Sequence, residues 1–484
     1  MEIPFIELFH TPNGSYFLDI NRNDLIPIRE SSFKYLLEVL SGKKELDANE
    51  PEELTELRSQ GYLTFQSVVK EVQHAYLKFL RIFLQRKLAK ITLQLTQNCN
   101  FRCKYCIYSE NSSMLQRSHS SKHMSFEVAQ KAVDFLWKHS VDSQDINVGF
   151  YGGEPLLEFP LIQKLVAYCK ERFEGKKLTF SITTNGTLLS DEMIRYFEAH
   201  DISMMISLDG PKEINDQNRV FADGRGTYDS VMEHVYRIFK IAPEYAEKLQ
   251  ISMVMDPEND FDCINAICLQ GEELKRLNIM PSIIDREYDG TDVVFAEEYT
   301  WKYEYQRFLA NLSYFGRYPE DEVSPVASRS VTAAVSDNIK INTSMGLHRI
   351  DAPSGPCVPG QARLFVDVNG RLFPCERVSE NSPAMCIGTL DDGFYEENAQ
   401  RILNIGHLTE NACKKCWCFR YCSLCAKKAD TGSRHLSAKF RLSHCNESKA
   451  MAYSKLKQYL LFKEIPVFYP AQTRLIHTEG GQAT

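Results

Sequence analysis

Three cysteines with the spacing C-x3-C-x2-C lie in the stretch Cys99-Asn-Phe-Arg-Cys103-Lys-Tyr-Cys106, shortly after the alternating apolar run Ile91–Leu95. Thiolates this close together can converge on one soft metal centre, and four-iron clusters are held by such runs. Because a cluster has four irons and this loop supplies three sulfurs, one iron would keep an open position for chemistry. A zinc site is the alternative, but zinc sites usually pair C-x2-C units and use four ligands.

A second group of cysteines lies in the C-terminal part of the chain. Of the fifteen cysteines, nine lie between Cys357 and Cys445. The N-terminus lacks the basic start of a signal peptide, so the chain is predicted to be cytoplasmic, where disulfides are rare and clustered thiols indicate metal. Cys169, Cys263 and Cys268 lie in helix-like apolar patterns and are predicted to be small core residues.

Composition excludes several classes of protein. The chain has 484 residues, of which 43% are hydrophobic and 25% charged, values typical of a soluble protein with two to four domains. It has no run of 18 apolar residues, so no membrane-spanning helix is expected. A net charge of −8 without a large basic block argues against nucleic acid as the main partner.

Alternating strands and helices are expected to position the first three cysteines. Six strands are predicted, at 90–95, Ile146–Tyr151, Leu178–Thr183, Ser203–Ser207, Leu249–Met255 and Met280–Ile284. Helices are predicted behind Ser125 as N-cap and near Pro160, Asp191, Tyr228 and Asp262. This order favours an α/β fold with a parallel sheet, closed or partly closed. The active site is then expected at the C-terminal ends of the strands.

Polar motifs end the second, third and fourth of these strands. They are Tyr151-Gly-Gly-Glu-Pro155, Thr183-Thr-Asn-Gly-Thr187 and Ser207-Leu-Asp-Gly-Pro211, followed by Asp216-Gln-Asn-Arg219. Singly, each is typical of a turn, and glycine also lets a backbone approach a ligand closely. Together, in this order behind C-x3-C-x2-C, they resemble the GGEP, TTNG and SLDG…D..R elements of the radical S-adenosylmethionine (SAM) enzymes.

The resemblance implies a fold, two cofactors and a reaction. The fold is a partial (β/α)6 TIM-like barrel. A [4Fe-4S] cluster would be held by Cys99, Cys103 and Cys106, and SAM would be contacted by Tyr105, Gly152, Gly153, Glu154, Asn185, Ser207 and Arg219. The GGEP motif matches the family's contact to the SAM amino group, Asn185 and Ser207 its ribose contacts, and Arg219 its contact to the SAM carboxylate. In that family the cluster reduces SAM, and the released 5′-deoxyadenosyl radical abstracts hydrogen from a C–H bond.

Residues 1–85 are predicted to form a separate module. Two strand-like runs, Phe5–Phe9 and Tyr16–Ile20, flank an Asn13-Gly14 turn, which indicates a hairpin. One helix is predicted with Phe33, Leu36, Leu37 and Leu40 on one face, ended by Gly42, and another from Pro51 to near Gly61.

A hairpin with two or three short helices is winged-helix-like, and the usual function of that arrangement is DNA binding. Residues 1–70, however, hold 12 acidic and 7 basic side chains, a net charge of −5, whereas phosphate backbones require positive charge. The module resembles instead the peptide-recognition domains that precede many peptide-modifying radical SAM enzymes. In those domains a leader peptide adds as a strand to an exposed sheet edge.

The C-terminal cysteines resemble those of the SPASM domain, with its pattern C-x9–15-G-x4-C, then C-x2-C-x5-C-x3-C, then a last cysteine. Here Cys357 is followed by Gly370 and Cys375, and Asp367–Gly370 is predicted to be a hairpin turn that brings both cysteines onto adjacent strands. The remaining cysteines are Cys413, Cys416, Cys418, Cys422, Cys425 and Cys445. A zinc ribbon is the alternative.

The resemblance implies two auxiliary [4Fe-4S] clusters, hence three in the chain. One complete ligand set matches, namely Cys413, Cys416, Cys422 and Cys445, and Cys357 and Cys375 match two ligands of the other cluster. The pattern departs after Cys422, where two residues instead of three precede Cys425, and Cys418 is additional. Whether Cys425, Cys418 or Cys386 completes the first auxiliary cluster is left open, and one of its irons could hold a substrate thiolate.

The predicted domains are a winged-helix-like peptide-recognition domain (1–85), a radical SAM core (86–310), a linker or cap (311–350), a SPASM iron–sulfur domain (351–450) and a tail (451–484) that is helical to Phe462 and then extended. Phe295–Phe315 is predicted to be helical.

The expected function is that of a radical SAM maturase that links a cysteine sulfur to a carbon of a ribosomal precursor peptide with a leader. Flavodoxin or ferredoxin would be the electron donor. Alternatives are C–C cross-linking of side chains, a sulfatase-activating formylglycine enzyme, and a non-catalytic metal-binding scaffold for peptides. Glu376, directly after Cys375, lies where the formylglycine enzymes carry an acidic base; a solvated surface glutamate is the alternative for this residue.

Overall fold

The structure is a computed structural model that describes residues 2–47, 49–106, 108, 119–269, 272–275, 277–286, 293–343, 345–361 and 363–468. Its centre is a ten-stranded sheet with the order β10-β9-β8-β7-β6-β5-β12-β13-β14-β15. Six parallel strands make up most of it: β5 (Lys90–Thr96), β6 (Asp145–Gly152), β7 (Lys177–Thr184), β8 (Ile202–Ser207), β9 (Gln250–Met255) and β10 (Asn278–Ile283). All six predicted strands are confirmed. The sheet is open, with β10 at one edge and β15 at the other.

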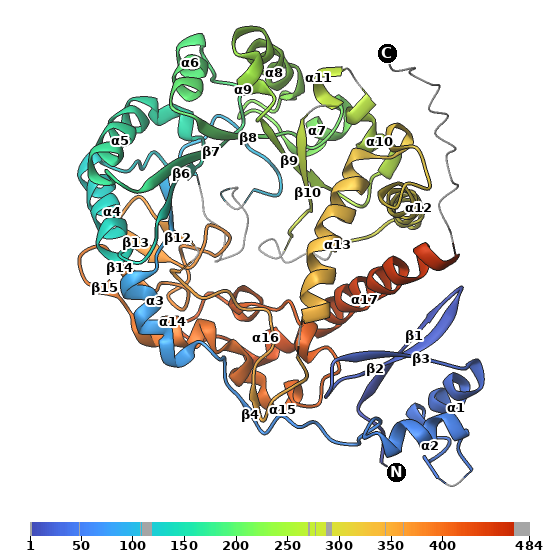
Figure 1. Cartoon of the computed structure of the whole chain (residues 1–484). Helices are drawn as coiled ribbons and strands as arrows, with labels where there is room; N and C mark the ends of the chain where they lie inside the picture. The colour runs from blue at the N-terminus through green and yellow to red at the C-terminus, as the bar shows by residue number, and fades with distance from the viewer. Residues whose placement is uncertain are drawn as a thin grey trace, which may run out of the picture.

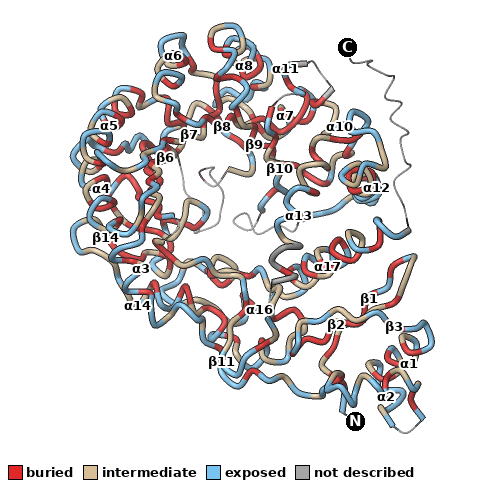
Figure 2. The backbone as a smooth tube through the Cα atoms, in the orientation of Figure 1, coloured by how far each residue is buried: buried red, intermediate tan, exposed pale blue. Residues whose placement is uncertain are grey.

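Helices cover the outer face of the curved sheet (Figure 1). They are α4 (Phe126–His139), α5 (Phe159–Arg172), α6 (Asp191–Ala199), α8 (Tyr228–Ile241) and α10 (Phe261–Asn265). Each begins where the sequence predicts, and the Ser125 side chain caps α4 by accepting a hydrogen bond from the Val128 amide at 3.2 Å. Ile91, Leu93 and Leu95 of β5 are fully buried on the helix side, and Figure 2 shows buried residues concentrated along these strands.

The C-terminal part of the chain extends the same sheet. Strand β12 (Leu364–Val366) pairs in parallel with β5, and β13 (Arg371–Phe373), β14 (Gly388–Thr389) and β15 (Gly393–Phe394) follow in antiparallel order. The hairpin predicted at Asp367–Gly370 is confirmed, with Gly370 at a φ of 80°. The expectation that this hairpin brings Cys357 and Cys375 onto adjacent strands is wrong. Strand β12 begins at Leu364, seven residues after Cys357, and β13 ends at Phe373, two residues before Cys375.

The N-terminal residues form a three-stranded antiparallel sheet of β1 (Ile6–Thr11), β2 (Gly14–Asp19) and β3 (Asp24–Ile28), with helices α1 (Glu30–Leu40) and α2 (Glu52–Ser59). The predicted hairpin and both helices are confirmed. Leu37, predicted on the packed face of α1, is 48% exposed, whereas Leu36 and Val39 are buried. The helix therefore packs through a face rotated from the predicted one.

Three long helices lie between the β10 edge of the central sheet and the N-terminal module (Figure 1). Helix α12 (Glu297–Tyr314) confirms the helix predicted at 295–315, whereas α13 (Pro325–Thr343), in the predicted linker, was not foreseen. Helix α17 runs from Cys445 to Phe468, so it begins before and ends after the predicted tail helix. The predicted extended end after residue 468 lies outside the described residues.

Shorter elements connect these parts: β4 (Glu71–Val72), α3 (Leu80–Arg86), α7 (Lys212–Asn218), α9 (Pro243–Ala246), α11 (Glu272–Lys275), β11 (Ile350–Asp351), α14 (Glu396–Leu403), α15 (Glu410–Cys413) and α16 (Ala438–Ser443). None of the fifteen cysteines forms a disulfide. Cys169 and Cys268 are buried as predicted, but Cys263 is exposed, so its prediction as a core residue is wrong. In the described part of the chain, no helix is long and apolar enough to span a membrane.

Candidate functional site

The first three cysteines lie in a loop beyond the C-terminal end of β5. The Cys99 thiol accepts a hydrogen bond from the Phe101 amide at 3.3 Å, and the Cys106 thiol accepts one from the Tyr108 amide at 3.4 Å. Burial, together with the neighbouring Glu154 and Cys106, raises the pKa of the Cys99 thiol to about 12. Burial likewise raises the pKa of Cys103, whose surroundings include both other thiols. The structure thus brings the three predicted ligands together.

The two glycines that end β6 make room for this loop. A Cβ added at Gly152 would lie 2.3 Å from the Thr96 carbonyl oxygen, and one added at Gly153 would lie 2.1 Å from the Asn98 carbonyl oxygen. The Gly153 and Glu154 amides donate hydrogen bonds to these same two carbonyls, each at 2.8 Å. The close approach expected of the glycines is therefore made to the backbone of the cysteine loop, and their contact with SAM stays a prediction.

Glu154 is buried at the junction of β6 and β7. Its carboxylate accepts hydrogen bonds from the Thr184 hydroxyl at 2.6 Å, the Asn185 amide at 2.8 Å and the Leu156 amide at 3.0 Å. Burial raises the pKa of Glu154 to about 7, although these hydrogen bonds act in the opposite direction. Glu154 thus fixes the end of β7 next to the cysteine loop.

Asn185 links the end of β7 directly to the cysteines. The side-chain nitrogen Nδ2 of Asn185 donates to the Asn100 side chain at 2.8 Å and to the Cys99 sulfur at 3.9 Å. Asn100 in turn donates to the Thr187 hydroxyl at 2.9 Å. Ser207, the other predicted ribose contact, lies partly exposed at the end of β8, opposite Ser252 of β9. The roles of Asn185 and Ser207 toward SAM stay predictions.

Arg219 belongs to a buried charged cluster. Its Nη2 atom lies 3.0 Å from Asp209 Oδ1, and its guanidinium lies 5.5 Å from the centre of the Tyr105 ring. The Tyr105 hydroxyl donates a hydrogen bond to the other oxygen of Asp209. The Arg219 Nε atom is buried without a hydrogen-bond partner. Tyr105 and Arg219, which lie 114 residues apart in the sequence, thus meet through Asp209, and the buried Arg219 Nε remains as a donor for an anionic ligand.

The sequence did not reveal a buried network that ties β5 to the C-terminal part. Gln94 donates hydrogen bonds to the Tyr108 hydroxyl at 2.7 Å and to the Glu380 carboxylate, and accepts one from the Val368 amide at 3.0 Å. Gln97 donates to the second Glu380 oxygen at 3.2 Å. No motif surrounds Glu380, so only the fold could identify it.

Five cysteines surround one cavity of about 150 Å³ in the C-terminal part. They are Cys413, Cys416, Cys418, Cys422 and Cys445, and Arg441, Ser448 and Lys449 also line the cavity. Cys418 donates a hydrogen bond to the Ser448 carbonyl at 3.7 Å, and the Ser448 hydroxyl donates to the Cys422 sulfur at 3.6 Å. The structure thus gathers the predicted complete ligand set Cys413, Cys416, Cys422 and Cys445, which belongs to the second auxiliary cluster, and places Cys418 beside it.

Cys375 and Cys425 form part of a separate group. Burial raises the pKa of Cys375 to about 11, with smaller contributions from Glu376 and from Cys425. Gly355 lies so close to Leu424 that a Cβ added at Gly355 would be 2.3 Å from the Leu424 carbonyl oxygen. The segment before Cys357 therefore runs beside the segment before Cys425. The fold therefore draws the chain segments of these three cysteines together.

Two further predicted residues take other positions. The Cys386 thiol donates a hydrogen bond to the Gly388 carbonyl at 3.4 Å. The charged groups near enough to influence the pKa of this thiol are Arg371 and Asp367. Glu376 pairs with Arg363, with 3.1 Å between the carboxylate and the guanidinium. The roles of Cys386 as a cluster ligand and of Glu376 as a base stay predictions.

The clustered cysteines have the chemistry of iron–sulfur ligands. A four-iron cluster spreads its thiolate ligands over separate irons. The buried thiols have raised pKa values and would need a metal centre to become thiolates. The residues present thus fit [4Fe-4S] clusters, and the unpartnered Arg219 Nε fits an anionic group of SAM.

The fold and the site define an open α/β sheet with a three-thiol loop at the C-terminal ends of its strands. Residues 93–267 match the model of the Radical SAM superfamily. The chain therefore contains a radical SAM domain, and it is homologous to anaerobic sulfatase-maturating enzymes.

Two relatives and one solved structure show how far the similarity extends. The serine-type anaerobic sulfatase-maturating enzyme of Bacteroides thetaiotaomicron is 30% identical over 30% of this chain and 35% of its own length. The cysteine-type enzyme of Clostridium perfringens is 24% identical over 68% of this chain and 85% of its own length. A solved structure of anSMEcpe with bound AdoMet and Cp18Cys peptide has a TM-score of 0.58 at 19% identity, covering 78% of this chain and 99% of that one.

The coverage differs among the relatives. In two relatives of at least 30% identity, the match spans only 47% and 35% of their own length. The solved structure establishes the fold, including the C-terminal extension of the sheet.

Proposed function

We propose that the chain is a radical SAM maturase that joins a cysteine sulfur to a carbon of a ribosomal precursor peptide. The observation that supports this proposal is that Cys425 lies near Cys375 and that the segment before Cys357 runs beside the segment before Cys425, whereas the Cys386 thiol bonds the Gly388 carbonyl. A four-iron cluster held by three protein thiols keeps one ligand position that a substrate cysteine can fill.

The residues around the first cysteine loop would hold the working cofactors. Cys99, Cys103 and Cys106 hold the cluster, and the buried Arg219 Nε is the donor for the SAM carboxylate. Asn185, fixed by Asn100, lies next to the Cys99 sulfur, where it can orient SAM. When bound, these cofactors supply a 5′-deoxyadenosyl radical that takes a hydrogen atom from the substrate. One-electron reduction by flavodoxin or ferredoxin is part of this proposal, as are three clusters and a cytoplasmic location.

The inner face of the sheet is suited to a polar peptide. On the side that the helices leave uncovered, Thr92 and Ser181 flank Gly149. A Cβ added at Gly149 would lie 3.3 Å from the Thr92 hydroxyl and 3.3 Å from the Ser181 hydroxyl. Ser181 donates to the Asn147 side chain at 3.1 Å, and Thr179 is exposed. Because the sheet is open, a chain substrate can reach this face and the cysteine loop from the side.

The N-terminal sheet offers an edge for a leader peptide. The sheet order β1-β2-β3 leaves β3 at an edge, and an extended peptide can add there as a further strand. The module is fixed to the catalytic part, because Glu464 of α17 accepts hydrogen bonds from Thr11 at 2.6 Å and Tyr16 at 2.7 Å. A leader bound at β3 would therefore be held at a constant distance from the chemistry.

Sulfatase maturation is the second candidate, favoured by the match over 85% of the Clostridium perfringens enzyme. That reaction would give Glu376 the role of base, but the pairing of Glu376 with Arg363 argues against it. Carbon–carbon cross-linking of side chains is a third outcome.

Co-expression with a candidate precursor peptide and tandem mass spectrometry of the product tests the proposal. Thioether formation removes a hydrogen atom from carbon, which the deoxyadenosyl radical would take, and a proton from sulfur, and the auxiliary clusters would accept the remaining electron. Each link therefore lowers the mass by two hydrogens and consumes one free thiol. The same mass loss with every cysteine still alkylatable would instead show a carbon–carbon link. Loss of the sulfur atom would show formylglycine formation from cysteine.

A further inference from the structure

Arg441 of α16 is one of the most deeply buried side chains of the protein, with 1% of its surface exposed. It lines the 150 Å³ cavity together with the five cysteines Cys413, Cys416, Cys418, Cys422 and Cys445. An arginine stays charged at this depth, because its guanidinium does not lose its proton in proteins. The fold therefore places a permanent positive charge among thiols.

None of the hydrogen-bond partners of Arg441 among the described residues is a carboxylate. Its Nη1 atom donates to the Thr409 hydroxyl at 2.9 Å and to the Cys413 sulfur at 3.8 Å, and its Nη2 atom donates to the Leu424 carbonyl at 3.4 Å. Its Nε atom is buried without a partner. In the described part of the chain, no carboxylate pairs with it, in contrast to Arg219, which pairs with Asp209.

An uncompensated buried charge is expensive. Removing an ion from water costs several kcal/mol even after the protein relaxes, unless a partner of opposite charge repays it. A cluster bound by thiolates is such a partner, because it carries net negative charge at the position that the cysteines surround. Arg441 thus points to an anionic group in this cavity independently of the cysteine spacing.

We propose that Arg441 is the internal counter-charge of the second auxiliary cluster and raises its reduction potential. The proposal rests on the cluster assignment of the proposed function and does not depend on which bond the enzyme forms. Reduction adds one electron to a group that is already negative. Cluster potentials respond to nearby charge and to hydrogen bonds to the sulfurs, so a guanidinium that donates to the Cys413 sulfur favours the reduced form.

The position of Arg441 also connects the two auxiliary groups. Its Nη1 atom reaches Cys413 of the second group, whereas its Nη2 atom reaches the carbonyl of Leu424, the residue before Cys425 of the first. The stronger effect is expected on the second group, because only there does the guanidinium donate to a cysteine sulfur.

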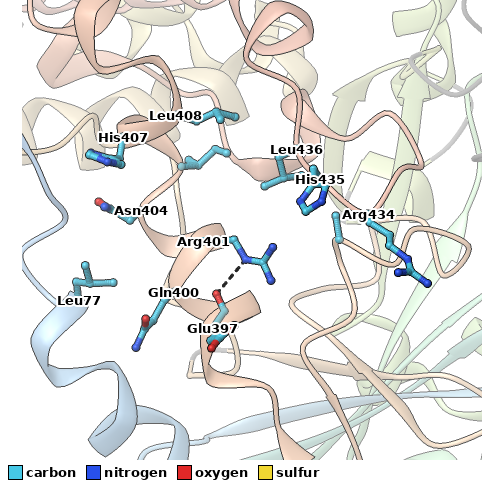
Figure 3. A pocket seen from close by; sticks show the side chains of 12 residues that line it. Leu77, Glu397, Gln400, Arg401, Asn404, His407, Leu408, Arg434, His435 and Leu436 are labelled. Carbon is cyan, nitrogen blue, oxygen red and sulfur yellow. Dashed lines mark hydrogen bonds between the residues drawn. The ribbon is translucent and has the colours of Figure 1, made fainter.

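The test compares Arg441→Gln and Arg441→Lys with a matched control. Arg401→Gln removes the same charge from an exposed arginine in a separate hollow of about 470 Å³ (Figure 3), where the Arg401 Nε atom donates to the Glu397 carbonyl at 3.4 Å. Each purified full-length enzyme is titrated anaerobically with dithionite, and its cluster signals are followed by electron paramagnetic resonance. Iron content and circular dichroism are measured on the same samples.

Arg441→Gln is expected to lower the potential of the second auxiliary cluster by about 59 mV or more, which is a tenfold shift of a one-electron equilibrium. Arg441→Lys should keep most of the wild-type potential, and Arg401→Gln all of it. If Arg441→Gln loses iron instead, rescue of the iron by Arg441→Lys also supports the counter-charge.

An unchanged potential in iron-replete Arg441→Gln would overturn the inference. So would equal loss of iron in both variants, because then the shape of arginine matters and not its charge. A wild-type enzyme that shows no second auxiliary signal would refute the cluster assignment itself, and a wild-type enzyme with the signal but another peptide product would refute only the thioether reaction.

Discussion

The Nη2 atom of Arg219 lies 3.0 Å from the Oδ1 atom of Asp209, and both side chains are buried. The same carboxylate accepts a hydrogen bond from Tyr105, the residue before Cys106, and another from the Val254 amide at 3.0 Å. Asp209 thus connects the cysteine loop, the end of β8 and β9. The ion pair fixes the cofactor loop as well as the arginine expected to bind SAM.

Asp209→Asn is predicted to destabilise the fold by about 3–5 kcal/mol, because breaking a buried pair leaves an uncompensated charge. The measurement is the urea midpoint of anaerobic, iron-loaded protein. Asp223→Asn is the control, since it removes a carboxylate from the exposed Asp223–Arg225 pair and should leave the midpoint unchanged. Equal midpoints for Asp209→Asn and wild type would show that Arg219 finds another partner.

Replacing Cys99, Cys103 and Cys106 together by alanine is predicted to abolish SAM cleavage and leave about two-thirds of the iron, because the other two clusters have separate ligands. Release of 5′-deoxyadenosine and iron content check this. Cys169→Ala is the matched control, since that thiol is buried in α5 and should change neither quantity. Retained cleavage, or loss of all iron, would contradict the assignment.

The six central strands and the cysteine loop were predictable because short apolar runs and fixed motif spacing are local signals. The attachments of the loop were not. Asn185 and Asn100 are 85 residues apart, and nothing in either segment names its partner. Arg441 gave no sequence signal either, because an arginine in a helix is ordinarily solvated. Only the fold shows that its helix faces a cavity of thiols.

Helix α13 shows a second kind of limit. Its sequence, from Pro325 to Thr343, is rich in Ser, Thr, Val and Asn, residues of modest helix propensity. Packing overrides that propensity, since Val326, Ala327 and Val331 are buried, the last two of them in a cluster with Leu309 and Ala310 of α12. For Leu37 the helix was predicted but not its orientation, because neighbouring apolar residues made two faces nearly equivalent.

Glu154 is predicted to make stability fall as the pH rises from about 4.5 to about 7. Its pKa is raised to about 7 by burial, so over this window the folded chain keeps a proton that the unfolded chain has released, and stability declines by on the order of 1–3 kcal/mol. Above about pH 7 the dependence ends. The measurement is the difference in urea midpoint between wild type and Glu154→Gln against pH. A difference that does not vary with pH would show that Glu154 is ionised throughout.

Leu25→Pro is predicted to weaken leader binding at least tenfold. Pro27 of β3 has no N–H, so it must occupy a position whose backbone nitrogen faces away from β2. Leu25 lies two residues earlier on the same strand, so its N–H also faces away from β2. The Leu25 amide is thus a free-edge donor that an added strand would use. Fluorescence anisotropy with a labelled leader measures the affinity.

Leu25→Ala is the control for that variant, because it removes the side chain but keeps the N–H, and it should bind the leader nearly as well as wild type. Equal weakening by both substitutions would mean that the leader contacts the side chain. If neither weakens binding, the leader binds elsewhere.

Cys425→Ala is predicted to remove up to about one-third of the iron, permit SAM cleavage and stop product formation, whereas Cys386→Ala should leave all three unchanged. Cys425 lies near enough to Cys375 to contribute to the raised pKa of that thiol. The Cys386 thiol instead bonds the Gly388 carbonyl at 3.4 Å and lies near Arg371 and Asp367. Iron analysis, 5′-deoxyadenosine release and peptide mass are measured on both variants. Iron loss in Cys386→Ala would make it the fourth ligand of a closed cluster, with no position for a substrate thiol. The sulfur-to-carbon reaction would then lose its structural basis, and carbon–carbon linkage would be favoured.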